Sequence, residues 1–176
     1  MQNVRNIVKI SFFTALICLL SLIKLPVFPV PVSLAFFAVN TIVLISDLKV
    51  SFISVLLYVI LGLCGLPVFS QGGGIGYVLN ISFGYLLGFL VAPFTSFLAK
   101  KVFKTKSYNM ILGIINIFTV YTFGCLYAWV LSYIYLKTKM DIKYLITYFV
   151  LIFIPTDMIF CYLSSKIAER LKRIVK

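Results

Sequence analysis

Asp157 is the side chain in this sequence with the clearest potential for chemistry. It lies in an apolar run near the end of the chain, directly after Pro155 and Thr156. A helix that begins at the proline, a favoured first-turn residue, would support a negative charge here through its dipole and free amides. A buried carboxylate also needs hydrogen-bond donors, and a ligand rich in N–H groups would supply them. The alternative is a helix-cap acid bonded to its own backbone.

A glycine-rich segment, residues 65–77, is the second candidate for function. It contains no charged residue, has three consecutive glycines at positions 72–74, and has a fourth at Gly76. Such a backbone does not form a stable helix alone. Exposed to lipid, its unpaired amides would cost several kcal/mol each. We expect an outer loop that closes over a small ligand as a lid; a flexible external hairpin is the alternative.

Two polar residues follow this loop directly and could fix a polar ligand. Asn80 offers an amide and Tyr85 a hydroxyl, although tyrosines are also common at membrane interfaces. Gly84 and Gly88 flank Tyr85 at the spacing that lets another helix approach closely. The residues that we expect to contact a ligand are Phe69, Gly73, Gly74, Asn80, Tyr85 and Asp157.

Several kinds of chemistry are excluded by the residues that the sequence lacks. It has no histidine, so it has no Ser-His-Asp triad and no His-ligated zinc or haem. Its four cysteines are scattered in apolar runs without CxxC spacing, and we interpret them as small buried hydrophobes. No Gly-Lys dipeptide is present, hence no Walker A loop. We expect no catalytic residue, no metal and no cofactor.

The composition indicates an integral membrane protein. Hydrophobic residues make up 62% of the 176 positions and charged residues 11%, against about 25% charged in soluble domains, and the mean hydropathy is +1.13. The length allows about six helical spans of roughly 20 residues in a single integral domain. We predict spans at about 8–25, 33–46, 50–64, 78–99, 110–131 and 155–168.

The basic residues predict the orientation of these spans. The net charge of +12 does not suggest nucleic-acid binding, because the sixteen Lys and Arg are confined to short segments between apolar runs. With both termini in the cytoplasm, twelve of the sixteen lie inside and four outside, which fits the positive-inside rule. The four outside are Lys24, Lys137, Lys139 and Lys143. The glycine-rich loop, residues 26–31 and Asp157 then share the outer side.

The first and last spans raise separate questions. Ser11 and Ala15 in the first span form a small-xxx-small pair that either meets another helix or simply faces lipid. Near the end, residues 144–165 could form one helix kinked at Pro155. We favour the other possibility, an interfacial helix up to about Phe153 and a new span from Pro155, which places Asp157 in a first turn.

The sequence resembles the BioY family, the biotin-binding S components of energy-coupling factor (ECF) transporters. The stretches that carry the resemblance are, in chain order, Val30-Pro31-Val32-Ser33, Ser54-Val55-Leu56-Leu57-Tyr58, Gly65-Leu66-Pro67-Val68-Phe69, the glycines of residues 72–76, Gly84-Tyr85-Leu86-Leu87-Gly88-Phe89 and Pro155-Thr156-Asp157. It implies a six-helix bundle and an external biotin site closed by two loops. It also implies a transmembrane coupling subunit, which Ser11 and Ala15 would face, and two cytoplasmic ATPase subunits.

Three positions depart from the family's usual pattern. Phe160 replaces a lysine, Ala35 replaces a glutamine, and Ile81-Ser82-Phe83 replaces Pro-Thr-Gly. From the resemblance we expect a prokaryotic cell-membrane S component that captures biotin for uptake. Because of these three departures, a related vitamin-like ligand is an alternative. A stand-alone carrier and a non-transport membrane assembly protein are further alternatives.

Overall fold

The computed structural model describes residues 2–25, 32–102, 108–134 and 147–174. Within these ranges six α-helices account for most of the chain. The α-helices are α1 (Gln2–Leu22), α2 (Ala35–Ile45), α3 (Leu48–Leu63), α4 (Phe83–Val102), α5 (Tyr108–Ile134) and α7 (Ile154–Ile174). The shorter elements are strands β1 (Lys24–Leu25) and β2 (Val32–Ser33), the 3-10 helix η1 (Ile75–Leu79) and the π-helical turn η2 (Thr147–Leu151). The predicted connection at residues 26–31 lies outside the described residues, as do Lys104, Lys106, Lys137, Lys139 and Lys143.

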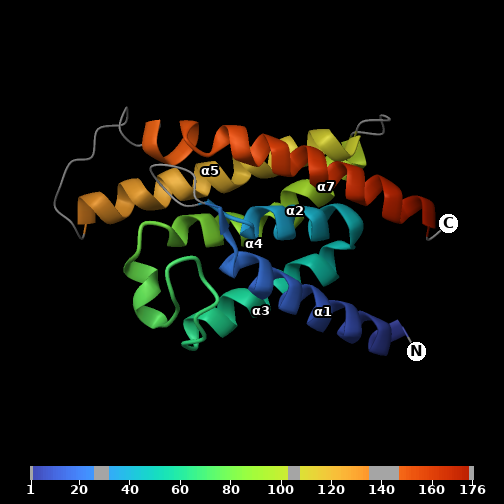
Figure 1. Cartoon of the computed structure of the whole chain (residues 1–176), viewed down its shortest axis with the longest axis horizontal. Helices are drawn as coiled ribbons and strands as arrows, with labels where there is room; N and C mark the ends of the chain where they lie inside the picture. Colours follow the sequence, from blue (N-terminus) through green and yellow to red (C-terminus); the bar gives the residue numbers. More distant parts are fainter. Residues whose placement is uncertain (1, 26–31, 103–107, 135–146, 175–176) are drawn as a thin grey trace.

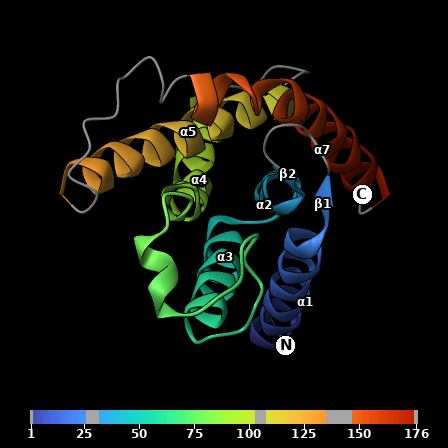
Figure 2. The same ribbon diagram turned by 60° about the vertical axis from the view of Figure 1, so that its left-hand side comes forward.

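The helices form three layers (Figures 1 and 2). Helices α5 and α7 make one layer, α1 and α3 the opposite one, and α2 and α4 lie between them. The first residues of α1, the last residues of α7 and the turn between α2 and α3 lie at one end of the molecule, and the glycine-rich loop lies at the other. Helix α2 is the central element, because nine of its eleven residues are buried.

The prediction of a six-helix bundle is confirmed, and the described residues are nearly all helical apart from the two short strands. Helices α1, α4 and α5 are long and apolar enough to cross a membrane, and α2 and α3 are shorter apolar helices. Helix α7 is long, but its second half carries Lys166, Glu169 and Arg170. Helix α4 begins at Phe83 and not near Val78, because residues 75–79 form the 3-10 helix η1. Hydropathy does not distinguish this apolar turn from the helix that follows it.

The last helix begins where the proline directs it. Helix α7 starts at Ile154, so that Pro155 and Asp157 lie in its first turn. The π-helical turn η2 ends at Leu151, and two turn residues separate it from α7. Of the two arrangements considered from the sequence, the described residues therefore show the break before Pro155 and not a continuous helix.

Helix α1 is joined to α3 through small polar residues. The hydroxyl of Thr14 donates to the carbonyl oxygen of Ser54 at 3.2 Å, and the hydroxyl of Ser54 donates to the carbonyl oxygen of Ile10 at 3.4 Å. On another face of α1, Ser11 and Ala15 are exposed. This small-residue pair is therefore not used in packing among the described residues.

Helices α4 and α5 approach closely because glycines line their contact. A Cβ atom added at Gly88 would lie 2.6 Å from the Cα atom of Val120, and one at Gly84 would lie 2.6 Å from the Cβ atom of Tyr127. From the other side, a Cβ at Gly124 would lie 2.8 Å from the ring of Tyr85. These glycines let the two backbones pack almost against each other.

A chain of polar side chains crosses the centre of the bundle. Asn116 donates to Asn40 at 2.8 Å and accepts from the Ser96 hydroxyl at 2.7 Å, and all three side chains are at most 1% exposed. The Nδ2 atom of Asn40 has no hydrogen-bond partner among the described residues. Nearby, the ammonium group of Lys100 donates to the carbonyl oxygens of Val43 (2.8 Å) and Ser46 (3.4 Å) at the end of α2.

Candidate functional site

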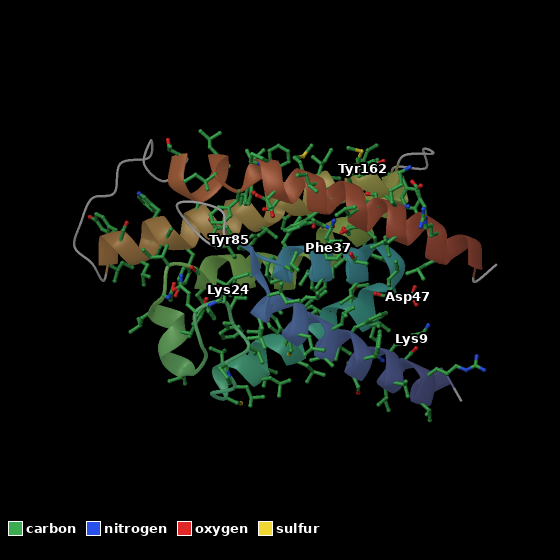
Figure 3. The ribbon with its side chains drawn as sticks, viewed as in Figure 1. Lys9, Lys24, Phe37, Asp47, Tyr85 and Tyr162 are labelled. Carbon is green, nitrogen blue, oxygen red and sulfur yellow. The ribbon has the colours of Figure 1, made fainter. Side chains whose placement is uncertain are left out.

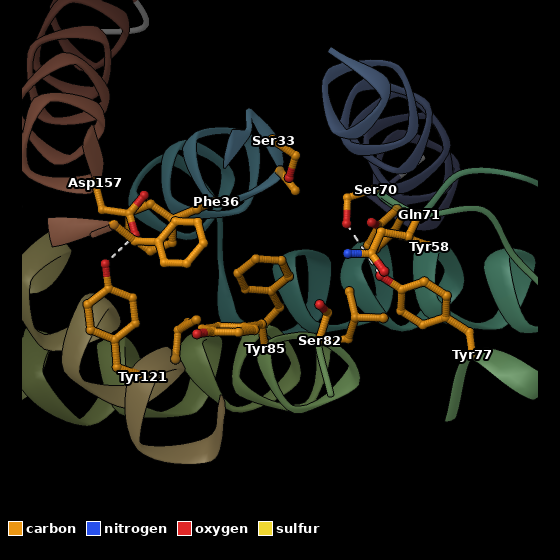
Figure 4. A pocket seen from close by; sticks show the side chains of 15 residues that line it. Ser33, Phe36, Tyr58, Ser70, Gln71, Tyr77, Ser82, Tyr85, Tyr121 and Asp157 are labelled. Atoms are coloured by element: carbon orange, nitrogen blue, oxygen red, sulfur yellow. Dashed lines mark hydrogen bonds between the residues drawn. The ribbon is translucent and has the colours of Figure 1, made fainter. Parts of the chain in front are cut away.

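A pocket opens among the helices near the glycine-rich loop (Figure 4). The space between its lining residues, counted out to the open mouth, is about 770 Å³. The residues that line it are Ser33, Ala35, Phe36, Tyr58, Ser70, Gln71, Tyr77, Ser82, Tyr85, Leu86, Phe89, Val120, Tyr121, Phe153 and Asp157. Most of the lining is apolar or aromatic. These residues include one acid and no Lys or Arg.

Asp157 lies at one side of the pocket, bonded to Tyr121 (Figure 4). The Tyr121 hydroxyl donates to the Oδ2 atom of Asp157 at 2.6 Å, and Asp157 is 6% exposed. The backbone amide of Asp157 donates to the carbonyl oxygen of Phe153. Among the described residues the carboxyl group makes neither an ion pair nor a bond to its own helix backbone. It is therefore held across the helix interface by a neutral donor, and its remaining acceptor capacity is directed to the pocket.

Aromatic rings surround this carboxyl group. The rings of Tyr85 and Tyr121 meet edge to face, with their centroids 6.4 Å apart, and Tyr85 also packs against Phe153 at 6.2 Å. The close contact of α4 with α5 brings Tyr85 near Tyr121, and the ring of Tyr85 lies against Gly124 of α5, where an added Cβ would be 2.8 Å away. The walls therefore suit a flat, mostly apolar ring system that presents N–H groups to Asp157.

The glycine-rich loop is a folded cap over this end of the bundle. Phe69 is 2% exposed, and its ring packs against Tyr58 (5.5 Å) and Tyr77 (4.6 Å). The ring occupies the space above Gly62, where a Cβ would lie 2.1 Å from it. The backbone of Phe69 exchanges two hydrogen bonds with Gly72. Phe69 was predicted to contact a ligand, but it lies beneath the loop and does not line the pocket.

Two predicted glycines shape the loop without lining the pocket. A Cβ at Gly73 would lie 2.1 Å from the carbonyl oxygen of Leu66, so no larger residue fits this backbone. Gly74 has a φ of 99°, in the region that favours glycine, and its amide donates to the carbonyl oxygen of Gly62 at 2.7 Å. The Gly74 amide thus ties the loop to the end of α3, and Gly73 packs closely against Leu66 within the loop.

Asn80 holds two of the pocket-lining residues in place through hydrogen bonds. Its Nδ2 atom donates to the Oε1 atom of Gln71 at 2.8 Å, and its Oδ1 atom accepts from the Ser82 amide at 2.9 Å. Gln71 and Ser82 line the pocket, whereas Asn80 does not. On the same side the hydroxyls of Ser70 and Tyr77 lie 3.3 Å apart. Burial raises the pKa of Tyr77, so its hydroxyl stays neutral.

Of the six residues predicted from the sequence, the structure therefore brings Asp157 and Tyr85 to the pocket wall. Sequence reasoning missed the hydroxyl of Tyr121 and the amide of Gln71. Gln71 lies within the segment that was singled out, and it is the only long polar side chain there. Tyr121 had no local signal, because it is one of eleven tyrosines and lies within a long apolar helix.

The three departures from the family's pattern differ in their position relative to the pocket. Ala35 lines the pocket near the start of α2. Phe160 is 5% exposed and packs against Phe37 with ring centroids 5.8 Å apart, and it does not line the pocket. The third, at residues 81–83, contributes Ser82 to the lining.

The chain is similar to known proteins along its full length. The BioY family model matches residues 1–176. A probable biotin transporter BioY of Lysinibacillus sphaericus is 32% identical over 99% of this chain and 90% of its own length. The biotin transporter BioY of Thermotoga maritima is 30% identical over 97% of each chain.

A solved structure has the same fold. The S-component for biotin from an ECF-type ABC transporter superposes with a TM-score of 0.79 at 30% identity, over 98% of this chain and 93% of that chain. The resemblance noted in the sequence is thus confirmed in sequence and in fold. On these matches the chain belongs to the BioY family, prokaryotic multi-pass membrane proteins that serve transport and are not enzymes.

Proposed function

We propose that this chain captures biotin as the substrate-binding S component of an ECF-type transporter. The observation that carries the proposal is the buried carboxyl group of Asp157 in an aromatic pocket that contains no base among its lining residues. Biotin has a ureido group with N–H donors on a compact, largely apolar bicycle. Such a ligand would give Asp157 the donors that a buried carboxyl group requires.

The proposal includes the direction of capture. The pocket lies near the glycine-rich loop, at the end of the molecule opposite the first residues of α1. The positive-inside rule puts both termini in the cytoplasm, so the pocket would face outward. Biotin would enter from outside and be held in the pocket.

The energy for uptake would come from partner subunits, because the sequence has no Walker A loop. We propose a transmembrane coupling subunit and two cytoplasmic ATPase subunits. The exposed pair Ser11 and Ala15 on α1 is the surface offered to the coupling subunit, since small residues allow close helix approach.

A binding titration tests the ligand. The detergent-solubilised protein should bind biotin with saturation at one site, and it should not bind thiamine or riboflavin, which lack the ureido bicycle. Absence of biotin binding in folded protein would overturn the proposal and would favour the assembly-protein alternative. Biotin uptake in cells that lack the coupling module would instead indicate a stand-alone carrier.

Co-purification tests the partner surface. Ser11→Trp or Ala15→Trp should leave biotin binding intact and should abolish recovery of the coupling subunit. Leu126→Trp is the matched control, because Leu126 is also exposed but lies on α5, in the opposite layer. An undiminished complex with the α1 variants would show that the coupling subunit binds elsewhere.

A further inference from the structure

A short β-ladder lies beside the mouth of the pocket. Strand β1 pairs antiparallel with β2, and Lys24 is directly opposite Ser33. The pairing continues into α2, since the amide of Leu34 donates to the carbonyl oxygen of Ile23 at 3.1 Å. Ser33 lines the pocket, and its side chain lies between the Asp157 side and the Tyr77 side of the pocket (Figure 4). The ladder therefore connects the end of α1 to the pocket wall.

The register of this ladder places Lys24 at the pocket mouth. Residues directly opposite each other in an antiparallel pair project to the same face, with Cβ atoms about 4.5–5.5 Å apart. Because Ser33 lines the pocket, the stem of Lys24 starts beside the lining, and its long flexible side chain extends from there. Lys24 lies toward the same end of the molecule as Tyr85, whereas Lys9 and Asp47 are at the opposite end (Figure 3).

The charge of Lys24 has no counterpart in the protein that the structure describes. Its side chain is exposed, and the ion pair found within the described residues joins Lys166 to Glu169 at the far end of α7. The neighbouring connection, residues 26–31, contains no acidic residue. The pocket lining has one acid, Asp157, and no base. The site thus has an acidic side chain inside and a basic side chain beside its rim.

We propose that Lys24 binds the anionic group of the ligand at the pocket mouth, so that the site selects molecules with an N–H-rich ring at one end and a carboxylate at the other. The inference rests on the proposed function, in which Asp157 holds the ring end. A carboxylate tail that reaches the rim keeps contact with water, and the register of the ladder places the side chain of Lys24 beside that rim.

The test compares biotin with biotinamide, in which a neutral carboxamide replaces the carboxylate. Wild-type protein should bind biotin about three- to tenfold more tightly than biotinamide, as expected for a partly solvated ion pair. Lys24→Gln should lose that preference by weakening biotin three- to tenfold and leaving biotinamide unchanged. Lys24→Arg should retain it, and the preference should shrink at high salt. Lys9→Gln, which removes an exposed cation at the opposite end, should change neither affinity.

Each other outcome has a definite meaning. Unchanged biotin affinity in Lys24→Gln would overturn the inference. An equal loss for biotin and biotinamide would also overturn it, because the lysine would then act on the fold of the ladder and not on the charge. If wild-type protein binds neither compound, the proposed function fails and the inference falls with it.

Discussion

Two polar clusters are buried in this bundle, and they differ in what lies next to them. Asp157 and Tyr121 share a 2.6 Å hydrogen bond at the wall of a pocket. Asn40, Asn116 and Ser96 form a chain of similar bonds, 2.7–2.8 Å long, that lines no described pocket. Both clusters bridge different helices. The first lies beside the pocket, whereas the second, here called the enclosed cluster, does not line it and is at most 1% exposed.

This difference separates a binding role from a structural one. Buried polar groups cost free energy unless they are paired. In the enclosed cluster each of the three side chains has a partner within the protein, although the Nδ2 atom of Asn40 has none among the described residues, and the bonds join α2, α4 and α5. In the pocket cluster, part of the hydrogen-bonding capacity of the Asp157 carboxyl group is available to a ligand. Both clusters are buried and polar, and the adjacent pocket distinguishes them.

The largest expected effect is on biotin affinity in Asp157→Asn. The amide can still accept from Tyr121, so the fold should persist, but hydrogen bonds to a charged acceptor are lost. Such bonds are worth about 1.5–3 kcal/mol, or roughly ten- to a hundredfold in affinity. Titration with biotin, with thermal unfolding as the control for folding, measures this. Wild-type affinity in the variant would make Asp157 a structural acid like the asparagines.

The corresponding substitution in the enclosed cluster is Asn116→Leu, which should affect stability and not biotin affinity. It leaves Asn40 and Ser96 without their partner at sites that are at most 1% exposed. We expect a loss of about 2 kcal/mol in stability, seen as a lower unfolding temperature in detergent, with biotin affinity within twofold of wild type. A large loss of affinity at unchanged stability would remove the distinction between the two clusters.

The loop that closes the pocket end offers a matched pair of substitutions. In Gly73→Ala the new Cβ would meet the carbonyl oxygen of Leu66, whereas at Gly76 a Cβ would meet nothing within 4 Å. Forcing the loop to shift should cost about 1–2 kcal/mol and should speed hydrogen exchange of the Gly74 amide. Gly76→Ala should leave this exchange unchanged. Equal exchange in both variants would mean that the loop is not fastened through Gly73.

Biotin should also protect this loop. If it acts as a lid, its amides exchange more slowly when the pocket is occupied, because ligand binding favours the closed state. Equal exchange with and without biotin would identify the segment as a rigid cap that takes no part in capture.

The smallest expected effect is that of Tyr121→Phe. The ring and its packing against Tyr85 remain, and only the hydroxyl that orients Asp157 is removed. One hydrogen bond is worth about 1 kcal/mol, which corresponds to roughly fivefold in biotin affinity. Titration of this variant beside Asp157→Asn shows how much of the carboxyl group's contribution depends on its orientation. No change in affinity would indicate that packing alone positions Asp157.

The sequence predicted those features that depend on neighbouring residues. Pro155 starts α7 because its ring suits a first turn and breaks a preceding helix, and this places Asp157 where it was expected. The glycines of the loop predicted an irregular segment, and the structure has one. The start of α4 was misplaced, because residues 75–79 are apolar and still turn as a 3-10 helix.

Features that depend on distant contacts could not be predicted. The bond between Tyr121 and Asp157 joins residues 36 apart in the chain, and nothing near Tyr121 marks it among the other tyrosines. Asn80 was expected to touch the ligand, but its amide donates to Gln71, because the folded loop brings these two residues together. Phe69 was assigned to the ligand because it lies in the loop, yet Gly62 provides the space that buries its ring.

The position of the Lys100 ammonium group has a consequence for how the bundle sits in a bilayer. Helix α2 has eleven residues, which rise about 17 Å, little more than half the hydrocarbon thickness. Its last carbonyls would therefore end at a depth where water is scarce. Lys100 covers the carbonyls of Val43 and Ser46 and brings a cation to the negative end of the helix dipole. One amino group thus gives the last carbonyls of this short helix the partner that lipid could not supply.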